Sequence, residues 1–158
     1  MALGKEFAVL FRRDLTKLAH EVSAFPDEDS LWKTIPGITN PAGNLVLHLE
    51  GNLREYIARI LVGLEYQRSR TDEFGKKHVP QAELSSRVKA LCDLIPVLLE
   101  EIPDARWSEE YPQVVLGQPM SNHQFVVHLQ GHFNYHLGQI DYLRRVLTGG
   151  SALEPIGL

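Results

Sequence analysis

The segment HFNYHLGQ near the C-terminus contains two histidines, His132 and His136, that are four residues apart. On an α-helix, residues with this spacing lie on the same side, offset by only about 40°. Two such imidazoles can bind one metal ion from a single helix. Phe133 stands where the HExxH motif of zinc peptidases carries its general-base glutamate, so the sequence argues against that class of enzyme.

Two histidines are too few for a stable metal site, so a third ligand must come from another part of the chain. His48, in NLVLHLEGN, is the best placed, because it borders an apolar stripe near the start of a predicted helix. His20 lies toward the end of the first predicted helix, and His78 lies in a polar loop. We therefore expect a three-histidine site made by His48, His132 and His136.

The helix that carries the histidine pair is predicted to run from Ser121, its N-cap, to about Thr148. His128 joins His132 and His136 in a slowly drifting stripe on the apolar face, so all three are expected to point inward. The residues predicted to share that face are Phe125, Leu129, Ile140, Leu143, Val146 and Leu147, and those predicted to face solvent are Gln130, Asn134, Asp141, Arg144 and Arg145. A buried imidazole needs partners for its ring nitrogens. A metal ion satisfies several at once; the alternative is that each ring bonds a carbonyl or a polar side chain.

Three further helices are needed to position these residues, and the sequence contains three more amphipathic segments. The first is KEFAVLFRRDLTKLAHEVSAF; the second starts at Asn40-Pro41 and runs to Leu64; the third starts near Pro80. Pro96 lies inside the third, where we expect a kink or a break. Together with the last helix they predict an all-α four-helix bundle that forms a single domain over residues 1–158.

The connecting loops are predicted to be long. Residues 30–40 are expected to form a loop with a short helical turn, and residues 65–79 a polar loop. Residues 103–120 contain three prolines and no helical period, which is consistent with a loose hairpin. The loops after the first and third long helices are long enough to cross over the bundle.

Composition narrows the function classes. The net charge of −4 gives no basic surface for nucleic acid, and no stretch approaches the roughly 20 apolar residues of a membrane span. Cys92 is the only cysteine, so no internal disulfide can form. We expect a cytoplasmic protein that binds neither nucleic acid nor membrane.

Two segments, GNLVLHLEGNLREYI and HLQGHFNYHLGQIDYLRRVLTG, resemble the DinB/YfiT-like superfamily. The resemblance extends over nearly the whole chain, including QRSRTDEF. It implies a four-helix bundle, a three-histidine site for a divalent metal at His48, His132 and His136, and a homodimer. Relatives often have a histidine directly before the second ligand of the pair, where this chain has Tyr135.

The resemblance also implies a range of activities, because the superfamily includes S-transferases that use low-molecular-weight thiols. We expect a metal-dependent enzyme with S-transferase-like or hydrolase chemistry on a small-molecule substrate, with zinc as the default metal and nickel or iron as alternatives. Tyr135 and Gln139 are the expected catalytic residues, because they share the histidine side of their helix. His128 and Glu50 are further candidates near the ligands. The alternative function is a non-catalytic, metal-stabilised helical module in a stress response or protein complex.

Overall fold

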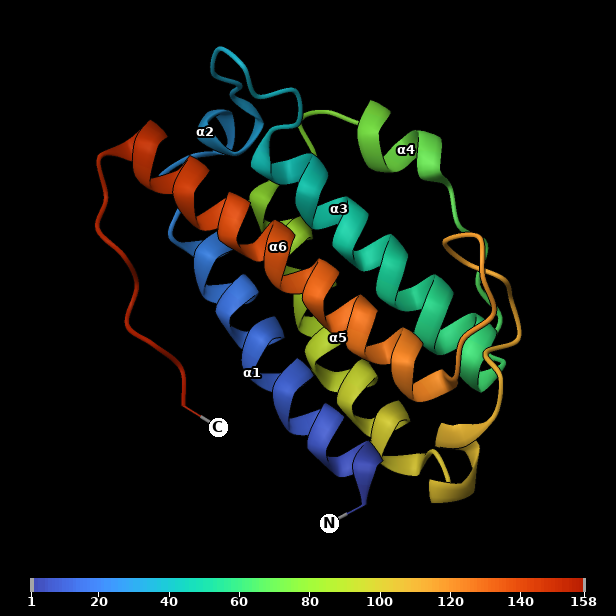
Figure 1. Cartoon of the computed structure of the whole chain (residues 1–158). Helices are drawn as coiled ribbons and strands as arrows, with labels where there is room; N and C mark the ends of the chain where they lie inside the picture. The colour runs from blue at the N-terminus through green and yellow to red at the C-terminus, as the bar shows by residue number, and fades with distance from the viewer. Residues whose placement is uncertain (1, 158) are drawn as a thin grey trace.

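The computed structural model describes residues 2–157. It shows the bundle of four long helices that the sequence predicts (Figure 1). The long elements are α1 (Leu3–Ser23), α3 (Ala42–Leu53) with the π-helix η1 (Arg54–Val62) that continues it, α5 (Gln81–Glu101) and α6 (Asn122–Thr148). Their apolar faces meet in one hydrophobic core. Within residues 2–157, every helix is too short or too polar to span a bilayer.

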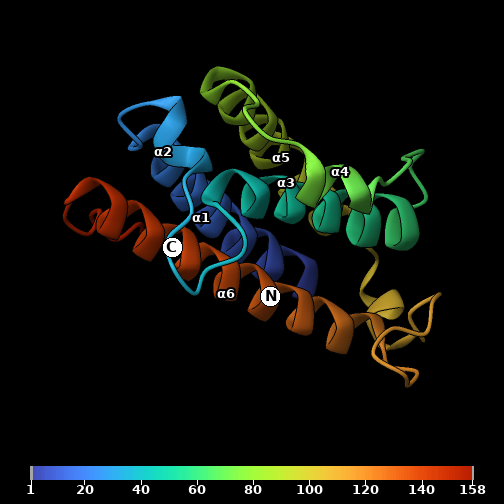
Figure 2. The ribbon, with the colours of Figure 1, turned by 90° about the horizontal axis from the view of Figure 1, so that it is seen from above.

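The order of the helices around the bundle brings α3 and α6 side by side. α1 and α3 each pack against both α5 and α6, so α1 lies diagonally opposite α3, and α5 lies opposite α6. Following the colours in Figure 1, α1 and α6 run in one direction and α3 and α5 in the other; Figure 2 shows the same bundle from above. The connections after α1 and α5 therefore cross the bundle, as their lengths predict.

Three short elements lie in the connections. The expected helical turn is confirmed as α2 (Glu28–Trp32). The loose hairpin is confirmed by two bridges, one between Glu110 and Ser121 and one between Val115 and Gln118. A 3₁₀ turn, η2 (Asp104–Ser108), precedes the hairpin. The prediction that residues 65–79 form a loop is wrong, because they contain α4 (Arg70–Gly75). Ser69 caps α4 by accepting a hydrogen bond from the Asp72 N–H. Ser69 and Asp72 form the S-x-x-D pattern of a helix start, which was available in the sequence.

The second and third long helices also differ from expectation. The second changes from α to π geometry at Arg54 and ends at Gly63, which has a left-handed φ of 95°, so Leu64 lies outside it and is exposed. The third is continuous through Pro96, so the expected break is wrong, whereas a kink there stays a prediction. The buried side chains around Pro96, including Ile95 and Leu99, belong to the core and hold this end of the helix in place.

The predicted faces of α6 are only partly right. Phe125, Leu129, Ile140 and Leu143 are buried as expected, but other positions differ. Phe133 and Leu137 are buried, as is Arg144, whose Nε donates to Glu21 Oε2 at 2.6 Å. Val146 is 63% exposed, and His128 is exposed. The reason is geometric: a stripe that advances by four residues drifts about 40° at each step, so His128 and His136 are about 80° apart. Only part of such a stripe can face the neighbouring helix.

Candidate metal centre

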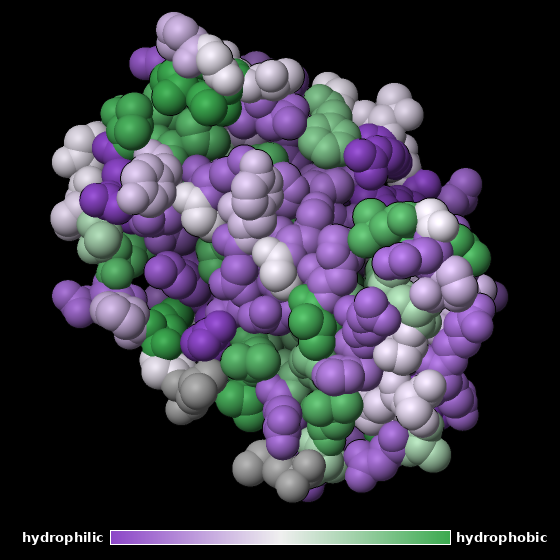
Figure 3. All heavy atoms as spheres, in the orientation of Figure 1, coloured by the Kyte–Doolittle hydropathy of each residue, from purple (hydrophilic) through white to green (hydrophobic). Residues whose placement is uncertain are grey.

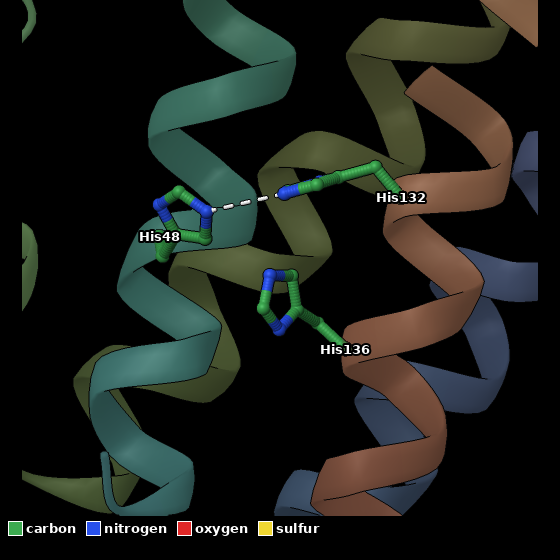
Figure 4. Close-up of side chains that lie close together, drawn as sticks. All are labelled: His48, His132 and His136. Atoms are coloured by element: carbon green, nitrogen blue, oxygen red, sulfur yellow. Dashed lines mark hydrogen bonds between the residues drawn. The ribbon is translucent and has the colours of Figure 1, made fainter. Parts of the chain in front are cut away.

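The three predicted histidines meet between α3 and α6. In Figure 4, His48 extends from α3 toward His132 and His136, which project from successive turns of α6. His48 Nε2 lies 3.4 Å from His132 Nε2, and one ring nitrogen of each histidine lies within 4.8 Å of the other two. His48 is buried, and the two histidines of α6 are half-buried. Adjacent packing of α3 and α6 therefore brings together residues separated by 84 positions in the sequence.

His48 is fixed from its far side by a buried carboxylate. Its Nδ1 lies 2.9 Å from Glu73 Oε2. Arg68 donates two hydrogen bonds to the same carboxylate, from Nε to Oε1 at 2.6 Å and from Nη2 to Oε2 at 2.9 Å. A carboxylate that accepts the Nδ1 proton leaves the lone pair on Nε2, the nitrogen that faces the other two histidines.

Docking of α4 on α3 brings Glu73 to this position. Asn44 Nδ2 donates to the backbone oxygens of Glu73 and Lys76, at 2.8 and 2.9 Å. Gly51 permits the approach, because a Cβ there would lie 2.0 Å from Glu73 Oε1. Asn44, His48 and Gly51 are spaced by four and three residues, so they form one stripe of α3 that receives α4.

Asn52 is a second polar neighbour of the histidines, and it is not among the predicted site residues. Its side-chain nitrogen lies 3.1 Å from His48 Nε2 and 3.4 Å from His132 Nδ1. It is 4% exposed and one helical turn after His48. Asn52 thus connects the histidine of α3 with the first histidine of α6.

On the α6 side, Gln139 is bonded to a predicted ligand and Tyr135 is not. His136 Nδ1 lies 2.7 Å from Gln139 Oε1, so Gln139 accepts the proton of that nitrogen and leaves Nε2 free. The Tyr135 side chain is 65% exposed, and its ring lies edge-on to that of His136 at 5.2 Å. Tyr135, His136 and Gln139 line one pocket of about 480 Å³.

The site favours neutral imidazoles on α6. Burial, followed by the neighbouring His136, His48 and His128, lowers the pKa of His132 to about 4. Burial also lowers the pKa of His136, against the opposing effect of its bond to Gln139. Burial alone would raise the pKa of Glu73, but hydrogen bonds from His48 and Arg68 outweigh it and hold that pKa below its usual value. The two histidines of α6 are therefore neutral nitrogen donors, and the carboxylate behind His48 is charged.

This donor set fits a borderline divalent metal. Two nitrogens at about 2.0–2.1 Å from a tetrahedral ion lie about 3.3–3.4 Å apart, and His48 Nε2 and His132 Nε2 are separated by 3.4 Å. Neutral nitrogen donors suit zinc, nickel or iron rather than magnesium or calcium, which prefer oxygen. The residues present therefore fit the kind of metal site expected from the sequence.

The remaining candidates lie outside the cluster. Glu50 is buried, and its carboxylate accepts hydrogen bonds from Arg54 and Arg87, so it is part of an ion-pair network of the bundle. His128 is exposed, with its ring centroid 6.5 Å from that of His132. His20 and His78 are exposed at other positions, in α1 and in the loop before α5.

Comparison with known proteins identifies the fold. No protein-family profile and no curated protein sequence matches the chain. Among solved structures, the crystal structure of a DinB-like protein from Bacillus cereus superposes with a TM-score of 0.72 over 94% of each chain, at 17% sequence identity. The chain therefore has the DinB-like helical fold that the two histidine motifs predict.

Proposed function

We propose that this protein is a divalent-metal-dependent enzyme that acts on a small molecule, with His48, His132 and His136 as its metal ligands. The observation that carries the proposal is the convergence of three imidazoles on one centre, with the Nδ1 atoms of His48 and His136 each engaged by a side-chain oxygen. Hydrogen bonds to the outer nitrogen of a histidine are typical of metal ligands. Zinc, with nickel or iron as alternatives, is the metal we expect.

Three protein ligands and an adjoining pocket suit catalysis better than a purely structural metal. Structural zinc sites commonly use four protein ligands, whereas catalytic sites keep a position open. A divalent ion held by three histidines supplies Lewis acidity, which lowers the pKa of a bound thiol or water and so generates a nucleophile. S-transferase-like chemistry with a low-molecular-weight thiol and hydrolysis of a small molecule are the two reactions we propose.

The protein's own residues would perform the orienting steps. Glu73 and Gln139 hold the rings of His48 and His136, and the half-buried pocket beside His136 brings a substrate to the open side of the centre. Tyr135 lines the same pocket and would donate a hydrogen bond to a ligand through its hydroxyl. This role, the homodimer and the cytoplasmic location stay predictions.

A chelator experiment tests the proposal against the non-catalytic alternative. Metal-loaded protein is assayed with thiols and electrophiles and with hydrolysable esters and amides, before and after treatment with a chelator, while circular dichroism follows the fold. We expect the rate to disappear after chelation while the helical signal is retained. Melting of the helices on chelation, with no activity across the panel, would instead identify the metal as structural.

A further inference from the structure

A pocket without charged side chains begins at the histidine cluster. It is formed by the segment between α2 and α3, by Leu45 of α3 and by the C-terminal half of α6, with a volume of about 480 Å³. His136 belongs both to the cluster and to the pocket wall. A ligand in this pocket therefore has one end beside the cluster.

The walls of the pocket are mainly aliphatic and aromatic. Ile35 and Ile38 come from the connecting segment, Leu143 and Val146 from α6, and Tyr142 lies beside them. In Figure 3, hydrophobic residues gather at the upper left, where the end of α6 meets α2 and the segment after it, next to the hydrophilic area over the middle of α6. The polar groups that line the pocket, including Asn40 and Gln139, are uncharged.

The absence of charge from this lining selects against charged ligands. No lysine, arginine, aspartate or glutamate is among the lining residues, and Arg145, which stacks on the Tyr142 ring, is paired with Asp141. A carboxylate or ammonium group that entered would lose hydration and gain no opposite charge. An apolar group would gain from leaving water.

A second pocket on α6 provides the contrast. It has a volume of about 300 Å³ and is lined by Arg13, Asp14, Lys17 and Asp141, among others, but by none of the three histidines. Asp141 belongs to α6 and the other three to α1, so the charged side chains of these two helices line a different pocket from the one at the cluster.

We propose that the pocket binds the uncharged, largely apolar part of a small-molecule substrate, with the reacting group directed at the histidine centre. The inference rests on the proposed function and specifies its substrate class. The pocket volume is within the usual range for small-molecule sites, roughly 300–1,000 Å³. In the thiol-transfer reaction, the pocket takes the apolar electrophile and not a highly charged thiol cofactor.

Two thiols that differ only in the charge of their tail test the inference. Benzyl mercaptan and 4-(mercaptomethyl)benzoate share a metal-binding thiol and a ring, and the second adds a carboxylate at the far end. Their affinities are measured by calorimetry on protein that holds one zinc per chain by metal analysis. We expect benzyl mercaptan to bind at least about tenfold more tightly, a difference of about 1.4 kcal/mol.

An exposed wall residue allows the charge of the pocket to be changed without disturbing the core. Val146→Lys adds a cation to the lining, and Val127→Lys is the matched control, because Val127 is also an exposed valine of α6 but does not line the pocket. Val146→Lys should reduce the ratio between the two affinities at least about threefold, because it strengthens binding of the carboxylate thiol and weakens binding of the neutral thiol. Val127→Lys should leave the ratio unchanged.

Each failure has its own signature. Protein that binds no zinc contradicts the proposed function, and with it this inference. Zinc-loaded protein that binds the two thiols equally, or the carboxylate more tightly, overturns the pocket assignment alone. The pocket assignment is also overturned if light scattering shows that Val146→Lys converts a dimer to a monomer while the ratio between the two affinities stays constant. The apolar surface would then be a subunit interface.

Discussion

His48 and His136 face the same centre from surroundings that differ in almost every respect. His48 lies on a helix whose residues are all buried, and its outer nitrogen is held by Glu73, which Arg68 clamps in turn. His136 is half-buried, is held by one bond to Gln139, and borders an uncharged pocket. The α3–α4 side of the cluster is closed and ionic, and the α6 side is open and apolar.

The difference indicates a division of roles within the centre. Several mutually dependent contacts hold His48 on the closed side, so a change there should alter the position of a ligand. The open side leaves space for a second molecule, so a change there should mainly alter what binds beside the ligands. Metal affinity and ligand preference are therefore expected to respond to mutations on different sides of the centre.

The largest effect is expected when a ligand is removed from either side. His48→Ala or His132→Ala should abolish stoichiometric metal binding, because two imidazoles are too few for a stable site. His20→Ala is the control, since His20 is an exposed histidine of α1. Elemental analysis of the purified variants provides the measurement. Full metal content in either ligand variant would contradict the three-histidine site.

Loss of the carboxylate behind His48 is expected to have the next largest effect. Glu73→Gln should lower metal affinity by roughly 10- to 100-fold, because the amide no longer fixes the proton on Nδ1 or balances Arg68. Glu50→Gln is the matched control, as Glu50 is equally buried and ion-paired but bonds Arg54 and Arg87 instead of a histidine. Competition with a chromogenic chelator measures both. Equal loss of affinity in the two variants would show that Glu73 acts only through stability.

Gly51→Ala tests whether α4 must approach α3 this closely. The added Cβ would displace the Glu73 carboxylate, so we expect a loss of about 1–3 kcal/mol in the free energy of unfolding. Metal affinity should fall by less than in Glu73→Gln, because the carboxylate is shifted and not removed. Gly131→Ala, at an open position of α6, should be neutral or stabilising by up to about 1 kcal/mol. Denaturant titration and metal competition measure both variants. Equal stability and equal metal affinity in the two would contradict the close approach of α4 to Gly51.

On the open side, Gln139→Ala should cost less affinity than any change around His48. We expect a decrease of less than about tenfold, because the half-buried ring of His136 can replace the lost bond with one to water. Gln124→Ala, an exposed position in the first turn of the same helix, should have no effect. A loss larger than that of Glu73→Gln would reverse the assignment of the two sides.

The last prediction concerns how the free energy of unfolding of the metal-free protein depends on pH. The folded-state pKa of His132 is about 4, below its unfolded value of about 6.5. The unfolded chain therefore binds a proton first, so stability should fall as the pH decreases from about 6.5 to 4. Urea titrations of metal-free protein across this range measure the slope, which should become smaller in His132→Gln and stay the same in Gln124→Ala, where no titratable group is removed.

The parts of the site that could be predicted from the sequence are those governed by local periodicity. Helical phase predicts that His132 and His136 lie together, and the need for a third ligand from another helix indicates His48. The prediction that His128 also points inward is wrong, because the drift of about 80° over eight residues carries its side chain out to solvent. Glu73 was missed for a different reason: its role depends on a long-range contact between α4 and Gly51 that no local pattern encodes. Only the capping pattern that starts at Ser69 indicated a helix there.

The central claim is that three histidines from two helices bind one metal ion, and a crystal structure of the cobalt-loaded protein tests it most directly. Anomalous diffraction at the cobalt edge should show one strong peak per chain, with His48, His132 and His136 each coordinating it through one ring nitrogen at about 2.0–2.1 Å. A peak at any other position, or one that His48 does not ligate, would contradict the account.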